Sequence, residues 1–176
     1  KDGELSLITA RYRQDVLGQN VVLIDPYDVV ASRLGVEPAG LNPFREIDSD
    51  SDEAFDEAML LAEATTIGEQ GGDPFWMDEA ATLIAGLTLH QVQWGKTLKD
   101  LRSGLNRDRD GFEQLIYEMG ASPYDLVKSA AARLSNKADR ERSSVISSAQ
   151  RNTHYLESKK LAESLSRSDF KLSDIG

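Results

Sequence analysis

The chain has 176 residues, a formal net charge of −10, 40% hydrophobic residues and no cysteine. A chain of this length and composition can bury a core of its own, which argues against a disordered segment. The absence of cysteine excludes disulfides, thiolate nucleophiles and thiolate metal sites, and the negative charge opposes general binding to a phosphate backbone. No apolar run approaches the roughly 20 residues that span a bilayer, so we expect no direct membrane contact by these residues.

Residues 1–45 have the pattern of a piece of an α/β domain. Residues 5–17 read as a helix that is closed by Gly18. Residues 20–26 form a short run rich in β-branched side chains that ends at Pro26, which is typical of a buried strand in a parallel sheet. Because one strand cannot make a sheet, we interpret residues 1–45 as a small α/β remnant whose partner strands lie elsewhere.

Residues 46–167 change to the 3.6-residue periodicity of helices joined by short connections. The sequence therefore predicts a mainly α fold, a compact helical bundle with the α/β remnant at its N-terminus. The expected helices cover residues 52–66, 75–94, 97–105, 112–119, 122–134, 139–156 and 158–165. Residues 168–176 leave the bundle and are predicted to return toward the missing sheet.

Capping signals and apolar positions specify these helices further. Asp73 is expected to cap the helix that Pro74 begins, Thr97 with Asp100 to begin the next short helix, and Asp139 to cap the helix that follows it. A glycine in mid-helix, Gly86, indicates close approach by a neighbouring element. Other side chains predicted to face the core include Phe55, Ala58, Met59, Ala62, Trp76, Leu83, Leu87, Trp94, Phe112, Leu115, Ile116, Met119, Leu126, Val127, Ala130, Ala131, Leu134, Val145, Ile146, Ala149, Asn152 and Leu156.

The chain lacks the patterns of a nucleotide site. No G-x-x-x-x-G-K-[ST] loop occurs, and the glycine-rich residues 68–73 contain no lysine and follow no strand, so we interpret them as a connection. Asp25 at the end of the predicted strand is a weak catalytic signal, and turn chemistry is its simpler interpretation. We therefore expect no catalytic residue and no bound cofactor in this chain.

Metal sites are also not expected. Residues 106–111 and 48–52 resemble the start of calcium loops, but Tyr117 and Met59 stand where such a loop needs its twelfth-position glutamate. Capped turns explain both stretches. The two histidines, His90 and His154, have no second histidine or cysteine at metal-ligand spacing, and a triad of Ser147, His154 and an acid lacks a nucleophile elbow.

A dense acidic run is the strongest candidate for a binding site. With Glu46, it consists of Asp48, Asp50, Asp52, Glu53, Asp56 and Glu57, and it contains seven negative charges and, after Arg45, no positive one. Such like charges repel one another unless a cationic group relieves them. The run is open to two interpretations, a solvated rim before a helix or a docking surface for a basic partner.

A smaller basic group lies on and before the helix that starts near residue 139. It consists of Lys137, Arg140, Arg142 and Arg151. These side chains are candidates for contact with DNA, although acidic neighbours such as Asp139 and Glu141 also fit a solvated, self-paired helix face.

Several motifs follow one another in an order that resembles a known family. They are Val22-Leu23-Ile24-Asp25-Pro26, Leu41-Asn42-Pro43-Phe44, Asp73-Pro74-Phe75-Trp76, Glu141-Arg142-Ser143 with Ala149-Gln150-Arg151, and Ser168-Asp169-Phe170. The chain resembles the all-alpha domain, with short flanks of the nucleotide-binding domain, of type IV secretion coupling proteins, the TraG/TraD-like ATPases. Lys1-Asp2-Gly3-Glu4 is similar to the family's Lys-Gly-Glu element, from which Asp2 departs.

The resemblance implies a division of the chain and a role for it. Residues 1–45 would be a remnant of the nucleotide-binding domain, residues 46–167 the all-alpha substrate-receiving domain, and residues 168–176 the return segment. The parent proteins are homohexameric ATPases of the bacterial inner membrane that use ATP and magnesium, and the all-alpha domain faces the cytoplasm at the channel entrance. No catalytic residue can be transferred, because the nucleotide motifs of the family do not occur in these residues.

The resemblance leaves two functions. In the first, the domain recognises secreted effectors, relaxases with basic signals, or adaptor proteins. In the alternative, it is a structural and mechanical element of the hexamer that guides DNA into the pore.

Overall fold

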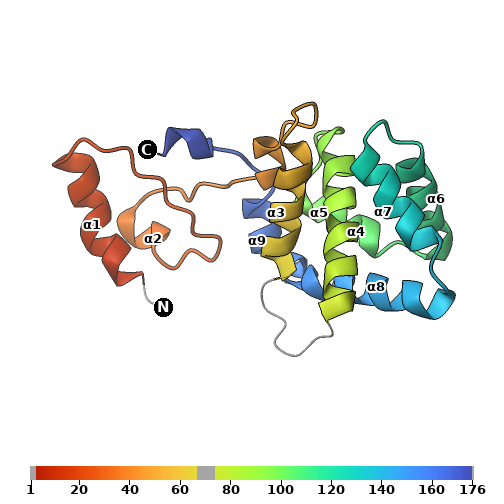
Figure 1. The fold of residues 1–176 in the computed structure, drawn as a ribbon. Coiled ribbons are helices and arrows are strands. Elements are labelled where there is room, and N and C mark those ends of the chain that lie inside the picture. Colours follow the sequence, from red (N-terminus) through yellow and green to blue (C-terminus); the bar gives the residue numbers. More distant parts are fainter. Residues whose placement is uncertain (1–2, 67–73, 176) are drawn as a thin grey trace. The chain divides into compact units, whose positions relative to one another are not determined.

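The computed structural model describes residues 3–66 and 74–175, and these residues are mainly α-helical (Figure 1). No strand occurs among them. The predicted fold class, a compact helical bundle, is confirmed. The described residues form two compact units, which we treat separately.

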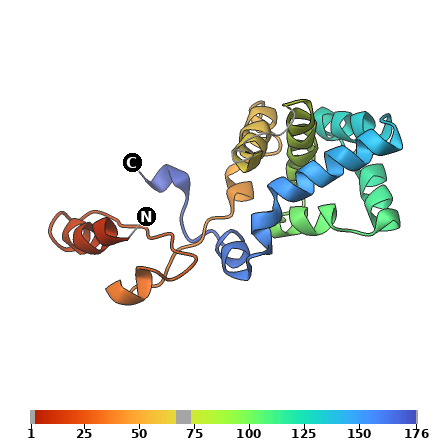
Figure 2. The same ribbon diagram turned by 90° about the horizontal axis from the view of Figure 1, so that it is seen from below.

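The larger unit, Pro43–Glu157, is the helical bundle. Helices α3, α4 and α7 lie side by side (Figure 1), and α8 crosses α4 (Figure 2). Helix α4 contacts α3, α5, α6, α7 and α8. The elements are η1 (Pro43–Glu46), α3 (Ala54–Thr66), α4 (Pro74–Val92), α5 (Leu98–Leu105), α6 (Arg109–Gly120), α7 (Asp125–Ser135), α8 (Asp139–Asn152) and η2 (His154–Glu157).

Helix α4 is buried on nearly all sides between Glu79 and Gln91. A helix with apolar residues all around its circumference belongs in a core, and Leu83, Ile84 and Leu87 have almost no exposed surface. At Gly86 the helix α7 comes so close that an added Cβ would lie 2.4 Å from the Cβ of Ala130. The close approach predicted at this glycine is confirmed.

The fully covered face of helix α3 consists of alanines. Its buried residues are Ala54, Ala58 and Ala62, spaced by four. The predicted inward position of Phe55 is wrong, because the face that packs closely is the alanine face and Phe55 remains 53% exposed. Met59, also predicted inward, is half-buried.

Both tryptophans are also less buried than predicted. Trp94 lies beyond the C-terminus of α4 and is 67% exposed. Trp76 is half-buried, and its ring packs edge-on against Phe75 with a centroid separation of 4.9 Å. The prediction that Trp76 faces the core is therefore met only in part, since the first turn of α4 lies outside the most closely packed part of the helix.

Local signals fixed several helix starts. Asp100 accepts hydrogen bonds from the Thr97 backbone nitrogen and hydroxyl at 2.9 and 2.8 Å and thereby caps α5 as predicted. Pro74 begins α4, whereas Asp73 lies outside the described residues. The cap predicted at Asp139 is wrong, because Ala138 occupies the N-cap of α8 and Asp139 is the first helical residue. The predicted apolar sets of α6 and α7 are all buried.

The second unit contains the described residues up to Asn42 and those from Ser158 onward. Its elements are α1 (Glu4–Asp15), α2 (Ala31–Leu34), α9 (Lys159–Ser164) and η3 (Leu172–Asp174). The two stretches are tied by hydrogen bonds from the backbone nitrogens of Gly40 to Asp169 Oδ2 (2.7 Å) and of Leu41 to the Ser164 carbonyl (2.9 Å). The compact units thus divide at residues 42/43 and 157/158, where the sequence placed boundaries at 45/46 and 167/168.

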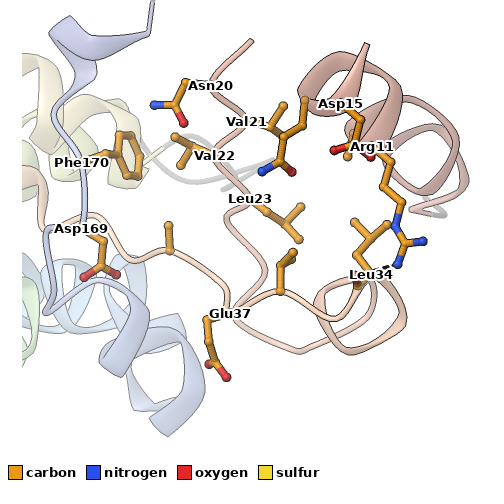
Figure 3. Close-up of a pocket in the computed structure, with 14 residues that line it drawn as sticks. Arg11, Asp15, Asn20, Val21, Val22, Leu23, Leu34, Glu37, Asp169 and Phe170 are labelled. Atoms are coloured by element: carbon orange, nitrogen blue, oxygen red, sulfur yellow. Dashed lines mark hydrogen bonds between the residues drawn. The ribbon is translucent and has the colours of Figure 1, made fainter. Parts of the chain in front are cut away.

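The prediction of a strand at residues 20–26 is wrong, because the structure has no strand there. A backbone hydrogen bond joins the Ala39 nitrogen to the Leu23 carbonyl at 2.8 Å. A cavity of about 370 Å³ lies along it, lined by α1 residues such as Arg11 and by Phe170 (Figure 3). A strand requires a partner ladder, and none of the described residues supplies it.

We predict that Gly86→Ala destabilises the bundle by about 1–2 kcal/mol. Overpacking of a close helix contact costs about 1–3 kcal/mol and exceeds the helix-propensity gain of about 1 kcal/mol. Urea unfolding of the full chain measures the change. The exchange Gly86→Ala with Ala130→Gly should recover most of the loss, and Gly120→Ala, where an added Cβ meets nothing within 4 Å, should be neutral or stabilising. If Gly86→Ala leaves the unfolding free energy unchanged, α4 and α7 can move apart at no cost.

Candidate partner-binding surface

The acidic segment, defined as residues 46–57, runs from the end of η1 to the first turn of α3. Its first part forms a structured turn, in which Asp48 Oδ1 accepts a hydrogen bond from the Asp50 nitrogen at 3.1 Å. Asp50 Oδ1 in turn accepts one from the Tyr124 hydroxyl, just before α7, at 3.0 Å. No sequence pattern points to this tyrosine. These bonds hold the start of the segment on the bundle.

The rest of the segment presents its charge to solvent. Asp52, Glu53 and Asp56 are exposed and make no side-chain hydrogen bond or ion pair within the described residues. Glu57 differs, because it is half-buried. The three exposed acids lie within one turn of the start of α3, where the helix dipole favours negative charge by about 0.3–1 kcal/mol each. Local helix chemistry thus accounts for part of their charge, but it does not require three acids.

Large apolar side chains lie beside these acids. Because α3 uses alanines to pack on α4, Phe55 and Leu60 remain 53% and 68% exposed. The outer side of α3 therefore combines negative charge with apolar groups. We call the exposed side chains of Asp52, Glu53, Phe55, Asp56 and Leu60 the α3 surface.

Some residues of the predicted basic group form ion pairs within the bundle. Lys137 Nζ lies 3.0 Å from Glu79 Oε2 on α4 and 5.3 Å from the centroid of the Phe75 ring. Arg133 of α7 pairs with the other oxygen of the same carboxylate. Lys137 is largely buried by these contacts, so its charge serves the junction of α4 and α7.

The remaining basic residues differ in their surroundings. Arg142 Nη2 lies 2.7 Å from Glu113 Oε1 of α6 and the side chain is mostly covered. Arg140 and Arg151 are exposed. The structure therefore brings the four predicted residues to α8 and the turn before it, and it holds Lys137 and Arg142 in ion pairs.

A buried arginine that the sequence did not single out joins α5 to the end of α8. Arg102 donates to the Gln150 carbonyl, to Thr153 Oγ1 at 3.1 Å and to Glu157 Oε1 at 2.5 Å. Positive charge at a helix C-terminus interacts favourably with the carbonyl groups there. No sequence pattern pairs residues so far apart, so only the fold reveals this contact.

Other residues considered from sequence have structural surroundings. The carboxylate of Asp25 accepts hydrogen bonds from the backbone nitrogens of Val29, Val30 and Ala31 at 2.7–3.0 Å, which supports turn chemistry. Asp108 caps α6 through the Gly111 nitrogen at 2.9 Å. His90 is buried, and burial lowers the pKa of its imidazole. Across residues 3–66 and 74–175, no group of three histidines or acids is placed to hold a metal ion.

Comparison with known proteins identifies the family. Residues 2–176 match the family described as type IV secretory system conjugative DNA transfer. The chain belongs to this family. The predicted resemblance to TraG/TraD-like coupling proteins is thereby confirmed, and a role in type IV secretion follows from it. Comparison with curated proteins and with solved structures gave no match.

None of the described helices combines the length and the apolar character that a bilayer crossing requires.

We predict that the ion-pair junction at Glu79 makes this protein less stable in acid. Burial alone would raise the pKa of Glu79, but hydrogen bonds and positive charge from Arg133 and Lys137 outweigh it, so the pKa is lowered. A lowered folded-state pKa gives stability that is present above the unfolded value of 4.5 and lost as the pH falls through the folded value.

The test compares urea unfolding of wild type and Glu79→Gln from pH 7 to pH 3. At pH 7 the variant should lose about 3 kcal/mol, because Lys137 is left covered and unpaired. The difference should shrink as the pH falls. If the difference in unfolding free energy between wild type and Glu79→Gln stays constant across this range, Glu79 is not the titrating group.

Proposed function

We propose that this chain is the substrate-recognition module of a type IV secretion coupling ATPase. In this proposal it binds basic segments of secreted effectors, relaxases or adaptor proteins through the α3 surface. The observation that carries the proposal is the orientation of α3, which buries only Ala54, Ala58 and Ala62 and leaves acids and large apolar side chains outside.

Physical complementarity supports a basic, amphipathic partner. Opposite charge across an interface raises the association rate and makes it sensitive to salt. Exposed apolar groups such as Phe55 and Leu60 supply contact area that slows dissociation. A purely solvated rim needs the acids but has no use for these two side chains.

The remaining parts of the proposal rest on the family. The parent protein would be a homohexameric ATPase of the inner membrane that binds ATP and magnesium, with this bundle at the cytoplasmic face of the channel entrance. Residues 1–45 and 168–176 would belong to its nucleotide-binding domain and residues 46–167 to the all-alpha domain. We propose no catalytic or cofactor-binding residue within this chain.

The alternative is a mechanical element of the hexamer that guides DNA into the pore. Lys137, Arg140, Arg142 and Arg151 would make the contacts, and the family's part in conjugative DNA transfer favours it. Against it, Lys137 and Arg142 are held in ion pairs with Glu79 and Glu113. The net charge of −10 adds a repulsive background for a polyanion.

Binding kinetics test the charge of the α3 surface. The probe is a synthetic amphipathic peptide rich in arginine and leucine, with single-stranded DNA as the competing ligand. The variant Asp52→Asn, Glu53→Gln, Asp56→Asn should lower the peptide association rate about tenfold at low salt, with a smaller loss at physiological salt. Glu57, Asp48 and Asp50 are left intact because they are half-buried or hold the turn.

A matched variant controls for net charge and helix dipole. Asp110→Asn, Asp139→Asn, Glu141→Gln removes three exposed acids from the first turns of α6 and α8 and should leave the association rate near that of wild type. If both triple variants lower the association rate equally, the loss reflects the net charge of the protein and not the α3 surface. Tighter binding of DNA than of the peptide would favour the mechanical alternative.

The apolar part of the same surface has a separate readout. Phe55→Ser should raise the peptide dissociation rate about tenfold, corresponding to about 1.4 kcal/mol, with little change in association. Tyr117→Ser, which truncates a more exposed aromatic side chain on α6, is the control and should not alter dissociation. If both variants release the peptide at the wild-type rate, the apolar side chains of α3 take no part in binding.

A further inference from the structure

A cavity that the proposed function does not use lies between the end of α5, the start of α6 and the first turns of α8. Its volume is about 350 Å³. Helix α8 packs against α4, α5 and α7, and an ion pair between Arg142 and Glu113 joins it to α6 at one side of the cavity. The Arg142–Glu113 ion pair thus connects α6 and α8 beside a space that their side chains leave unfilled.

Arginines approach this cavity from two sides. Arg107 comes from the connection before α6, Arg109 from the first turn of α6, and Arg142 from α8. The carboxylates of Glu113 and Asp139 also line it, so the lining has three positive and two negative side chains. On a chain with a net charge of −10 this locally positive lining is unusual.

Two of these arginines have donors without acceptors. Arg109 is exposed and makes no hydrogen bond or ion pair within the described part of the chain. Arg142 faces Glu113 through Nη2, while its Nε is covered and has no hydrogen-bond partner among the described residues. A covered donor without an acceptor calls for an explanation, and an anion in the cavity would supply acceptors to this guanidinium group.

Apolar side chains also line the cavity, namely those of Leu105, Phe112 and Ile146. A matching ligand therefore has a charged end and a short apolar stem.

We propose that this cavity binds the carboxylate of a small organic acid with a short apolar stem. A guanidinium fork matches the planar geometry of a carboxylate, and the volume is at the lower end for small-molecule sites. Glu113, Asp139 and the overall negative charge oppose a polyanion, so nucleic acid is disfavoured. The proposal stands independently of the α3 surface.

Two-dimensional NMR titration of the full chain tests this site with N-acetyl-leucine as the probe. The acid should shift amide resonances around the cavity at millimolar concentration, whereas N-acetyl-leucinamide, which has the same stem without the charge, should not. Arg109→Gln should weaken binding about tenfold. Arg140→Gln, an exposed arginine of the same helix as Arg142 that does not line the cavity, should bind as wild type does.

Additional ligands test whether the carboxylate belongs to a polypeptide terminus or to a free acid, and whether other anions bind more tightly. A leucine-terminated peptide that binds more tightly than N-acetyl-leucine assigns the site to a polypeptide terminus, and equal affinities assign it to a free acid. Equal binding of acid and amide, an unaltered Arg109→Gln variant, or tighter binding of orthophosphate or an oligonucleotide would overturn the proposal.

Discussion

The bundle depends on the close approach of helices to α4. At Gly86 an added Cβ would lie 2.4 Å from Ala130 Cβ, and the buried residues of the neighbouring α3 are all alanines. Small side chains bring helix backbones together and allow many dispersion contacts over a short length. The remaining helices are placed by this arrangement, since α5, α6, α7 and α8 all contact α4.

The close packing of α3 on α4 also determines which α3 side chains are exposed. A helix that packs through alanines must direct its larger side chains elsewhere, so Phe55 and Leu60 lie outside with the acids of the α3 start. The proposed recognition surface is therefore a consequence of how the core is packed. Its acids remain available because the turn that precedes them is secured separately, through Asp48, Asp50 and Tyr124.

Ion pairs complete the junctions that apolar packing leaves open. Glu79 joins α4 to Arg133 and Lys137, Arg102 holds the end of α8, and Arg142 reaches α6. Each uses positive charge inside the bundle. Arg102, Lys137 and Arg142 are consequently less available to a nucleic acid than their positions in the sequence suggest.

The sequence by itself determined the features that depend on near neighbours. The Thr97–Asp100 cap, the buried sets of α6 and α7, the close contact at Gly86 and the family all follow from short-range patterns or from motif order. The acidic segment was also visible, because charge density is a property of composition.

Only the tertiary structure decided which sides of the helices are covered and which charges are paired. Periodicity places Phe55 and Ala58 near one another on a helix, but the close fit of α3 to α4 selects the alanines. Lys137 and Glu79 lie far apart in the chain, and no pattern predicts their contact. Residues 20–26 have the composition of a strand, yet an extended segment becomes a strand only where another backbone completes its hydrogen bonds.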